Sequence, residues 1–216
     1  MISKSFLLKP LAMLALVVAG GTCHAALTVY TSSVAFGSAI SAPGVDTYTG
    51  FSIIGTTPSP ITRTAGPYSY TATASTSTFF GAGTTANPWL STNVATDSIL
   101  FNGFAPSIKG IGANFFGSDI SGLFLAGSVT LTALDSLGAT STQTITGATV
   151  SSFLGFTTNG SITSLTLAAV QTAAPLWPTA DNLTLGLAAV VPEPGTYGLL
   201  AIGLGFLAFV ARRRRA

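Results

Sequence analysis

Apolar and polar residues alternate along several short stretches of this chain. Leu183, Leu185 and Leu187 are separated by Thr184 and Gly186, which is the period-2 pattern of a strand that buries one face. No stretch between the two ends of the chain shows the 3.6-residue period of an amphipathic helix. Strands are predicted at residues 27–30, 68–74, 98–101, 108–116, 129–133, 152–157, 165–169 and 183–187.

Residues 129–133 and 139–145 predict a β-hairpin, because Gly138 ends the turn that begins at Asp135 and can adopt a positive φ. Short strands separated by turn signals favour an all-β fold, an antiparallel β-sandwich or jelly roll. A β-solenoid is the alternative, although strict internal repeats are not visible. Residues 41–67 carry four prolines among Gly and Thr, and we expect an irregular loop there.

The chain's last apolar run predicts a membrane helix over residues 196–211. At about 1.5 Å per residue this helix would reach about 24 Å, which is short for a span that normally takes about 20 residues. Arginine side chains that snorkel to the headgroups would compensate for the short span. The positive-inside rule places these arginines in the cytoplasm and the residues upstream of Pro192 outside. The membrane stop consists of Arg212, Arg213, Arg214 and Arg215.

Pro192, Glu193 and Pro194 precede this run, with Gly195 between them and residue 196. The order of Pro-Glu-Pro, apolar helix and arginine cluster resembles the PEP-CTERM sorting domain, which marks exported proteins of Gram-negative bacteria that commonly make exopolysaccharide. The resemblance covers residues 191–216. It implies that an exosortase, a membrane-embedded protease or transpeptidase, recognises Pro192, Glu193 and Pro194. The protein would be tethered in the inner membrane until processing and would then reach the cell surface or the extracellular (biofilm) matrix.

The N-terminal segment agrees with export. Lys4 and Lys9 precede an apolar run, and small residues lead to Ala25, as in a secretory signal peptide spanning residues 1–25. We expect cleavage between Ala25 and Ala26 by signal peptidase after passage through the export translocon. A lipoprotein with Cys23 at its N-terminus and an uncleaved anchor are the alternatives. The remaining residues, 26–190, form the predicted ectodomain.

The only cysteine and the only histidine, Cys23 and His24, lie in the predicted signal peptide. The ectodomain therefore has no imidazole or thiol for a Ser-His-Asp triad, a conventional zinc site or a disulfide. We expect no cofactor and no metal. Nucleic acid is not an expected partner either, since phosphate binding needs clustered basic residues. Its charged residues are Arg63 and Lys109 against Asp46, Asp97, Asp119, Asp135 and Asp181.

Paired aspartates could still support a carboxylate-dependent polysaccharide hydrolase. Asp97, Asp119, Asp135 and Asp181 lie in turn-like or strand-edge contexts, where Asp side chains commonly bind the local backbone. We therefore expect a protein that is not an enzyme, and keep the hydrolase as the alternative.

Aromatic residues supply the candidate glycan contacts. Trp89 and Trp177 lie beside prolines in predicted loops, and Tyr68 and Tyr70 share one side of a strand. Packing over the sandwich core is the competing interpretation of these rings. Residues 108–187 also resemble jelly-roll modules akin to carbohydrate-binding domains. The sequence thus predicts an exported structural, adhesion or glycan-binding protein, with exopolysaccharide as a candidate partner.

Overall fold

The computed structural model describes residues 27–76 and 78–189, together with residues 198, 200, 202–204 and 212 of the C-terminal segment. The predicted signal peptide, its cleavage site at Ala25 and Ala26, and the Pro-Glu-Pro residues lie outside the described residues. Most of the predicted membrane helix over 196–211 also lies outside them, as do Arg213, Arg214 and Arg215. Among the positions that are described, no helix is long and apolar enough to cross a membrane.

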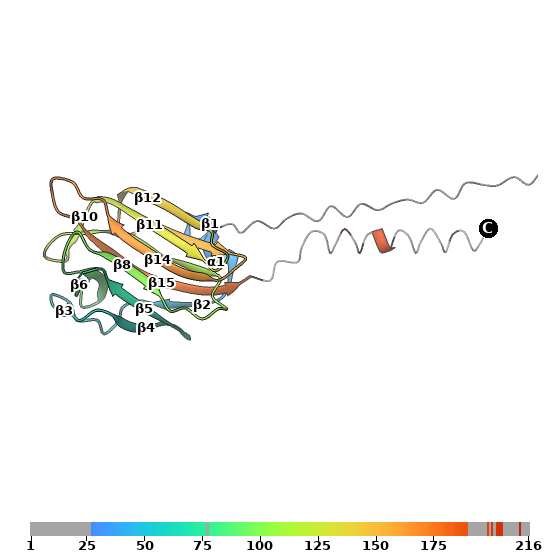
Figure 1. Ribbon diagram of the computed structural model, residues 1–216, viewed down its shortest axis with the longest axis horizontal. Helices are drawn as coiled ribbons and strands as arrows, with labels where there is room; N and C mark the ends of the chain where they lie inside the picture. The colour runs from blue at the N-terminus through green and yellow to red at the C-terminus, as the bar shows by residue number, and fades with distance from the viewer. Residues whose placement is uncertain are drawn as a thin grey trace, which may run out of the picture.

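The protein is all-β, with two antiparallel sheets stacked face to face (Figure 1). The nine-stranded sheet has the order β1-β13-β9-β15-β7-β6-β3, while β10 pairs with β9 and β2 pairs with β15. Its strands are β1 (Leu27–Tyr30), β2 (Ile40–Asp46), β3 (Thr56–Thr57), β6 (Phe79–Thr84), β7 (Asn87–Thr92), β9 (Gly110–Ser118), β10 (Phe124–Leu125), β13 (Phe153–Thr158) and β15 (Trp177–Ala188).

The six-stranded sheet has the order β12-β11-β14-β8-β5-β4. Antiparallel pairing throughout both sheets differs from the stacked coils of a solenoid. The predicted sandwich class is therefore confirmed at the level of two antiparallel sheets, and the jelly roll stays a prediction. The strands are β4 (Ile61–Ala65), β5 (Tyr68–Ala74), β8 (Ser98–Asn102), β11 (Gly127–Asp135), β12 (Thr140–Ala148) and β14 (Ile162–Ala169).

The core lies between the sheets and draws all its fully buried members from residues 48–185. Leu183 and Leu185 of β15 are buried and Leu187 packs against them, as their alternation predicts. The predicted hairpin is β11 and β12, and Gly138 in its turn has a φ of 84°. The body formed by residues 27–189 therefore carries its own hydrophobic core.

Strands interrupt the loop expected at residues 41–67, because β2, β3 and β4 form there. Residues 47–55, between β2 and β3, form neither helix nor strand, as expected. β2 pairs with β15 alone, and its register shifts between Leu185 and Leu187 of that strand. Ala42, with a φ of 47°, and Pro43 lie at this irregularity. Proline is tolerated in a strand at such edges and bulges, since it has no N–H to donate. The alternation that reveals a regular strand is therefore missing.

One helix, α1 (Ser33–Ala39), was not expected from the sequence. Ser32 caps it by accepting a hydrogen bond from the backbone N–H of Ala35 at 3.4 Å. Phe36 is its buried residue, and the ring lies over Gly155, where a Cβ atom would come within 2.6 Å of it. α1 is too short to show a helical period in the sequence.

Both connections of the body to the rest of the chain leave from one end. Leu27 of β1 pairs with Thr158, and the backbone of Lys109 bonds both Thr158 and Gly186 near the end of β15. Figure 1 shows β1, α1 and the last part of β15 together at this end, which we call the tail end. β3, β6 and β10 lie at the opposite end, the distal end (Figure 1).

Candidate functional site

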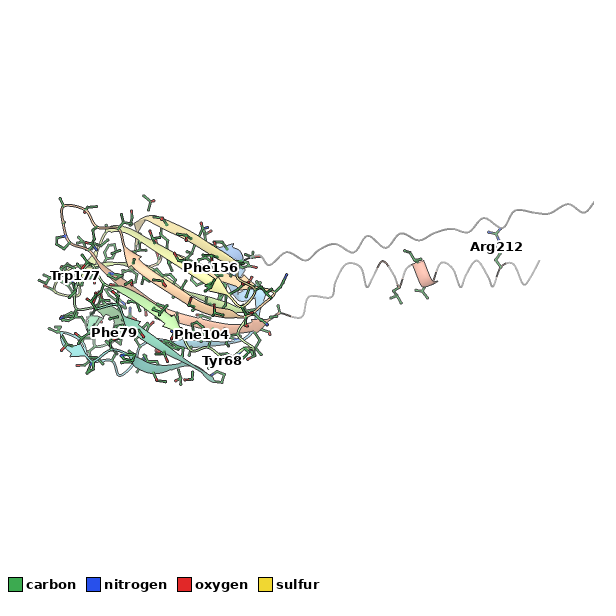
Figure 2. All side chains as sticks on the ribbon, viewed as in Figure 1. Tyr68, Phe79, Phe104, Phe156, Trp177 and Arg212 are labelled. Carbon is green, nitrogen blue, oxygen red and sulfur yellow. The ribbon has the colours of Figure 1, made fainter. Side chains whose placement is uncertain are left out.

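The two tryptophans lie on strands, not in loops as expected. Trp89 is in β7 and Trp177 opens β15. β7 and β15 are joined by two residue pairs, Thr179 with Ser91 and Ala180 with Leu90, and neither pair includes Pro88 or Pro178. The missing N–H groups of the two prolines therefore leave this pairing intact. Figure 2 shows Trp177 at the distal end, away from Tyr68, so the four candidate aromatic contacts do not form one surface.

Three of these aromatic residues are tied into the fold. Trp89 is half-buried, and its ring meets Phe116 edge-on at a centroid distance of 4.8 Å. Its Nε1 is buried without a hydrogen-bond partner among the described residues. The Tyr68 hydroxyl donates to the carbonyl of Ala42 at 2.7 Å. Tyr70 is 1% exposed and donates to Asp46, so it is a core residue and cannot contact a glycan at the surface.

A groove with a neutral polar lining lies between the open edges of the two sheets. We call it the Gln143 groove, and its volume is about 390 Å³, within the range of small-molecule sites. β12 forms one wall and β13 the other, and the turn between them closes one side. The lining residues are Thr31, Gln143, Thr144, Ile145, Thr146, Ser151, Ser152, Phe153 and Leu154.

The lining of the Gln143 groove combines hydroxyl and amide groups with apolar surface. Gln143 is half-buried, and its Nε2 donates to Ser141 at 3.3 Å. In the turn before β13, the Ser152 hydroxyl accepts a hydrogen bond from the backbone N–H of Thr149 and also bonds the Thr149 hydroxyl. Phe153 is held by Phe36, with ring centroids 5.5 Å apart. Uncharged donors and acceptors beside an aromatic ring match the chemistry of a sugar, which presents hydroxyls at its rim and CH groups on its faces.

Sequence reasoning missed this groove. β12 was recognised as a strand, but nothing in its hydroxyl-rich pattern shows that its edge faces β13. One signal was available: Gln143 is a long amide side chain in a run of Ser and Thr. The groove forms because β11 carries β12 to the edge of one sheet, while β1 and β13 form the edge of the other.

Asp119 and Asp135 bind backbone groups, as their turn-like contexts predicted. Asp119 accepts from the N–H groups of Ser121 and Leu123, both at 2.9 Å. Asp135 accepts from Leu137 and Ala139 in the β11–β12 turn. Burial raises the pKa of Asp135, but the hydrogen bond from Thr158 and those turn amides outweigh it and hold the pKa below its usual value.

Asp46 and Asp97 are buried and bound to side chains. Asp46 forms an ion pair with Arg63, whose Nε lies 2.6 Å from Oδ2. It is the only ion pair within the part of the chain that the structure describes. Asp97 accepts from the hydroxyls of Ser75 and Thr76. Both carboxylates therefore support the fold at these positions.

Asp181 is the carboxyl group with the least support. It is 5% exposed and lies on a bulge of β15, next to Asn182 with a φ of 55°. Asn182 donates to its Oδ2 at 3.0 Å, whereas Oδ1 has no partner with hydrogen-bond geometry in the described residues. Burial raises the pKa of Asp181, and the amides of Asn182 and Asn87 only partly offset this.

No group of three or more His, Cys, Asp or Glu that could hold a metal ion occurs in the described ranges, 27–76 and 78–189, or at the described positions beyond them. A smaller pocket of about 200 Å³ lies at the tail end. Lys109 lines it with Thr28 and Thr157, and its wall includes Ala189, the last described residue of the body.

No curated protein and no solved structure matches this chain. One family model does match, that of the PEP-CTERM protein-sorting motif, and it covers residues 190–215. The matched segment begins one residue after Ala189, at the tail end of the body. The chain therefore carries the PEP-CTERM sorting motif, the tag of exported proteins that are tethered in the membrane and processed by an exosortase.

Proposed function

We propose that this chain is an exported surface or matrix protein whose body binds polysaccharide without cleaving it. Exosortase processing would place the body at the cell surface, where it serves in adhesion or in the extracellular matrix. The observation that carries the glycan-binding part is the neutral lining of the Gln143 groove, with hydroxyl and amide groups beside Phe153. The groove replaces the tryptophans as the principal candidate contact.

The arrangement of the carboxylates supports a non-catalytic role. A glycosidase places two carboxyl groups about 5–10 Å apart on either side of the scissile bond. Asp119 and Asp135 are committed to turns, Asp46 to Arg63, and Asp97 to two hydroxyls. None of the five ectodomain aspartates lines the Gln143 groove.

A carboxylate-dependent hydrolase remains the second candidate, and Asp181 is the observation that favours it. A buried carboxyl with a raised pKa and an unsatisfied oxygen has the features of a general acid. A hydrolase of this kind also needs a second carboxylate beside the substrate. The two proposals differ in their product, because only the hydrolase shortens the polymer.

The test uses the body, residues 27–189, with exopolysaccharide from the native host. We expect the polymer to retain the protein and to gain no reducing ends. Replacing both Gln143 and Ser151 with Ala should weaken retention about tenfold or more, since each side chain offers hydrogen bonds to a sugar. Thr132→Ala, on the outer face of β11 and away from the groove, is the matched control.

Two results would overturn this proposal. New reducing ends that disappear in Asp181→Asn would establish the hydrolase. Retention that survives the double groove variant but is lost in Trp177→Ala would move the binding surface to the distal end. Export is tested separately by mass spectrometry of protein from its native host. Protein that still contains His24 and Arg215 would contradict processing at both ends.

A further inference from the structure

β12 is a free edge of the six-stranded sheet. It pairs with β11 on one side, and no described strand pairs with it on the other. The strand spans Thr140–Ala148 and contains no charged residue and no proline. Natural sheets usually protect their edges with charges, prolines, short strands or covering segments, because an open edge offers unpaired N–H and C=O groups to another strand.

The other edges of the two sheets have such protection. β4, at the far side of the six-stranded sheet, is five residues long, carries Arg63 and lies against β2. β1 has four residues and is flanked by α1. β3 and β10 have two residues each. β2, which pairs with β15 alone, is interrupted by Pro43 and by a register shift at that point. Among the described strands, β12 is therefore the long edge without a protective feature.

The outward-facing threonines of β12 are arranged symmetrically about Gln143. Thr142 and Thr144 precede and follow it, and Thr140 and Thr146 repeat the symmetry one step further out. On the outer face, the hydroxyl of Thr144 meets that of Thr130 at 3.0 Å. Thr142 likewise meets Thr132 at 3.1 Å. β12 thus already takes part in a ladder of paired threonines across the sheet.

We propose that two copies of this protein pair β12 with β12 in antiparallel orientation, around a two-fold axis at Gln143. In this register Thr142 of one copy lies opposite Thr144 of the other, and Thr140 lies opposite Thr146. The threonine ladder then continues across the interface, with Thr–Thr pairs of the kind that stabilise sheets. No like charges meet, because the strand carries none.

A second copy fits this edge for a geometric reason. A two-fold interface brings the same surface together from both copies, so a strand must complement its own reversed copy. The threonine pattern of β12 meets that condition at residues 140–146. The pairing closes at two copies and joins their six-stranded sheets into one continuous sheet. This inference does not depend on glycan binding.

Cross-linking tests the register directly. Cys23 is the only cysteine of the chain, so the body has no native thiol. Gln143→Cys places one thiol from each copy at the two-fold axis, where opposite Cβ atoms lie about 4.5–5.5 Å apart. We expect mild oxidation or a short bismaleimide to give a covalent dimer at low protein concentration. Thr64→Cys, on the exposed face of β4, is the control and should stay monomeric.

A charge variant tests the pairing without a cross-link. Thr142→Lys together with Thr144→Lys would bring lysines opposite each other at two points of the interface. We expect sedimentation to show a dimer for the wild type and at least a tenfold weaker dimer for this variant. The matched control, Thr62→Lys with Thr64→Lys on β4, should leave the dimer unchanged. Circular dichroism checks that both variants are folded.

The proposal is overturned if the wild-type body stays monomeric up to its solubility limit. It is also overturned if both lysine variants weaken association equally, since the interface would then not be β12. Dimers that form normally while Gln143→Cys fails to cross-link would exclude this register. Gln143 and Thr144 belong both to this interface and to the lining of the Gln143 groove. The dimer is therefore measured by cross-linking and sedimentation without polysaccharide, so that failure of the dimer and failure of glycan binding are read separately.

Discussion

Arg63 and Asp46 form a bidentate ion pair that joins the two sheets at one side of the sandwich. Arg63 lies on β4 of the six-stranded sheet, and Asp46 ends β2 of the nine-stranded sheet. The Arg63 Nε and Nη2 atoms donate to the two Asp46 oxygens at 2.6 and 2.8 Å. The hydrogen bonds that Arg63 donates to Asp46 are the main cause that raises the pKa of Arg63. The guanidinium also lies 5.2 Å from the centre of the Tyr48 ring.

Arg63→Ala should therefore destabilise the body by about 3 kcal/mol, because it leaves Asp46 buried without its counter-ion. The measurement is the free energy of unfolding from urea denaturation. Lys109→Ala removes the other cation of the body, which forms no ion pair among the described residues, and should change stability by less than about 0.5 kcal/mol. Equal losses of unfolding free energy in the two variants would contradict a stabilising role of the ion pair.

Tyr70→Phe should cost about 1.5–3 kcal/mol, since the Tyr70 hydroxyl donates to the buried carboxylate of Asp46 at 2.7 Å. Tyr68→Phe removes a bond to the carbonyl of Ala42 and should cost about 0.5–1.5 kcal/mol. Thermal and urea unfolding of the two variants provide the comparison. A larger loss in Tyr68→Phe would contradict the assignment of Tyr70 to the core.

The buried carboxyl of Asp181 should make the free energy of unfolding depend on pH. Burial raises the pKa of this carboxyl above its unfolded value, so the folded state holds more protons than the unfolded state between the two pKa values. Stability from this group therefore falls as pH rises through that window, and the penalty is complete above the folded pKa. Asp181→Asn should be more stable than the wild type at pH 7, and the difference should vanish below the unfolded pKa of about 3.9.

Urea unfolding from pH 3 to pH 7 checks the prediction for Asp181. Asp119→Asn serves as the control, because Asp119 lies in an exposed turn where its Oδ1 accepts backbone hydrogen bonds. An Asp181→Asn variant that is less stable than the wild type at pH 7 would mean that the charged carboxylate is satisfied in solution.

Two glycines predict opposite effects of the same substitution. A Cβ atom at Gly44 would lie 2.2 Å from the carbonyl oxygen of Ala65, so Gly44→Ala should push β2 from β4 and cost about 1–3 kcal/mol. Gly37 lies inside α1 with open space around it, and Gly37→Ala should stabilise the body by about 0.5–1 kcal/mol. Calorimetric melting temperatures report both changes. Two variants that shift the melting temperature in the same direction would contradict the tight contact at Gly44 or the open space at Gly37.

The sequence predicts those parts of the fold in which local pattern and final environment agree. Leu183 and Leu185 alternate with polar or small residues and face the core, and Gly138 marks the hairpin turn. β2 escapes prediction because its bulge at Ala42 and Pro43 breaks the period that a strand otherwise shows. α1 escapes because two turns of helix give too few positions to display a 3.6-residue repeat.

The candidate site was less predictable, since it depends on which strands become neighbours. Tyr70 and Trp89 were chosen by residue type, yet Tyr70 binds Asp46 inside the core and Trp89 packs on Phe116. The Gln143 groove joins β12 to β13, which belong to different sheets. Neither the alternation of residues along a strand nor the residues of its turns show which strand of the other sheet will lie beside it. The sorting motif differs, because a linear tag is read directly from its residues.

The position of β15 in the nine-stranded sheet sets the order in which this protein can fold. β15 is the last strand of the body to be synthesised, yet its first half pairs with β7, its second half pairs with β2, and β9 runs along its other side. Until this strand has emerged, β2 and the β6–β7 hairpin have no backbone link to β9. The sheet can therefore be completed only when the segment directly before the sorting motif has been made, so the chain remains incompletely folded throughout most of its synthesis.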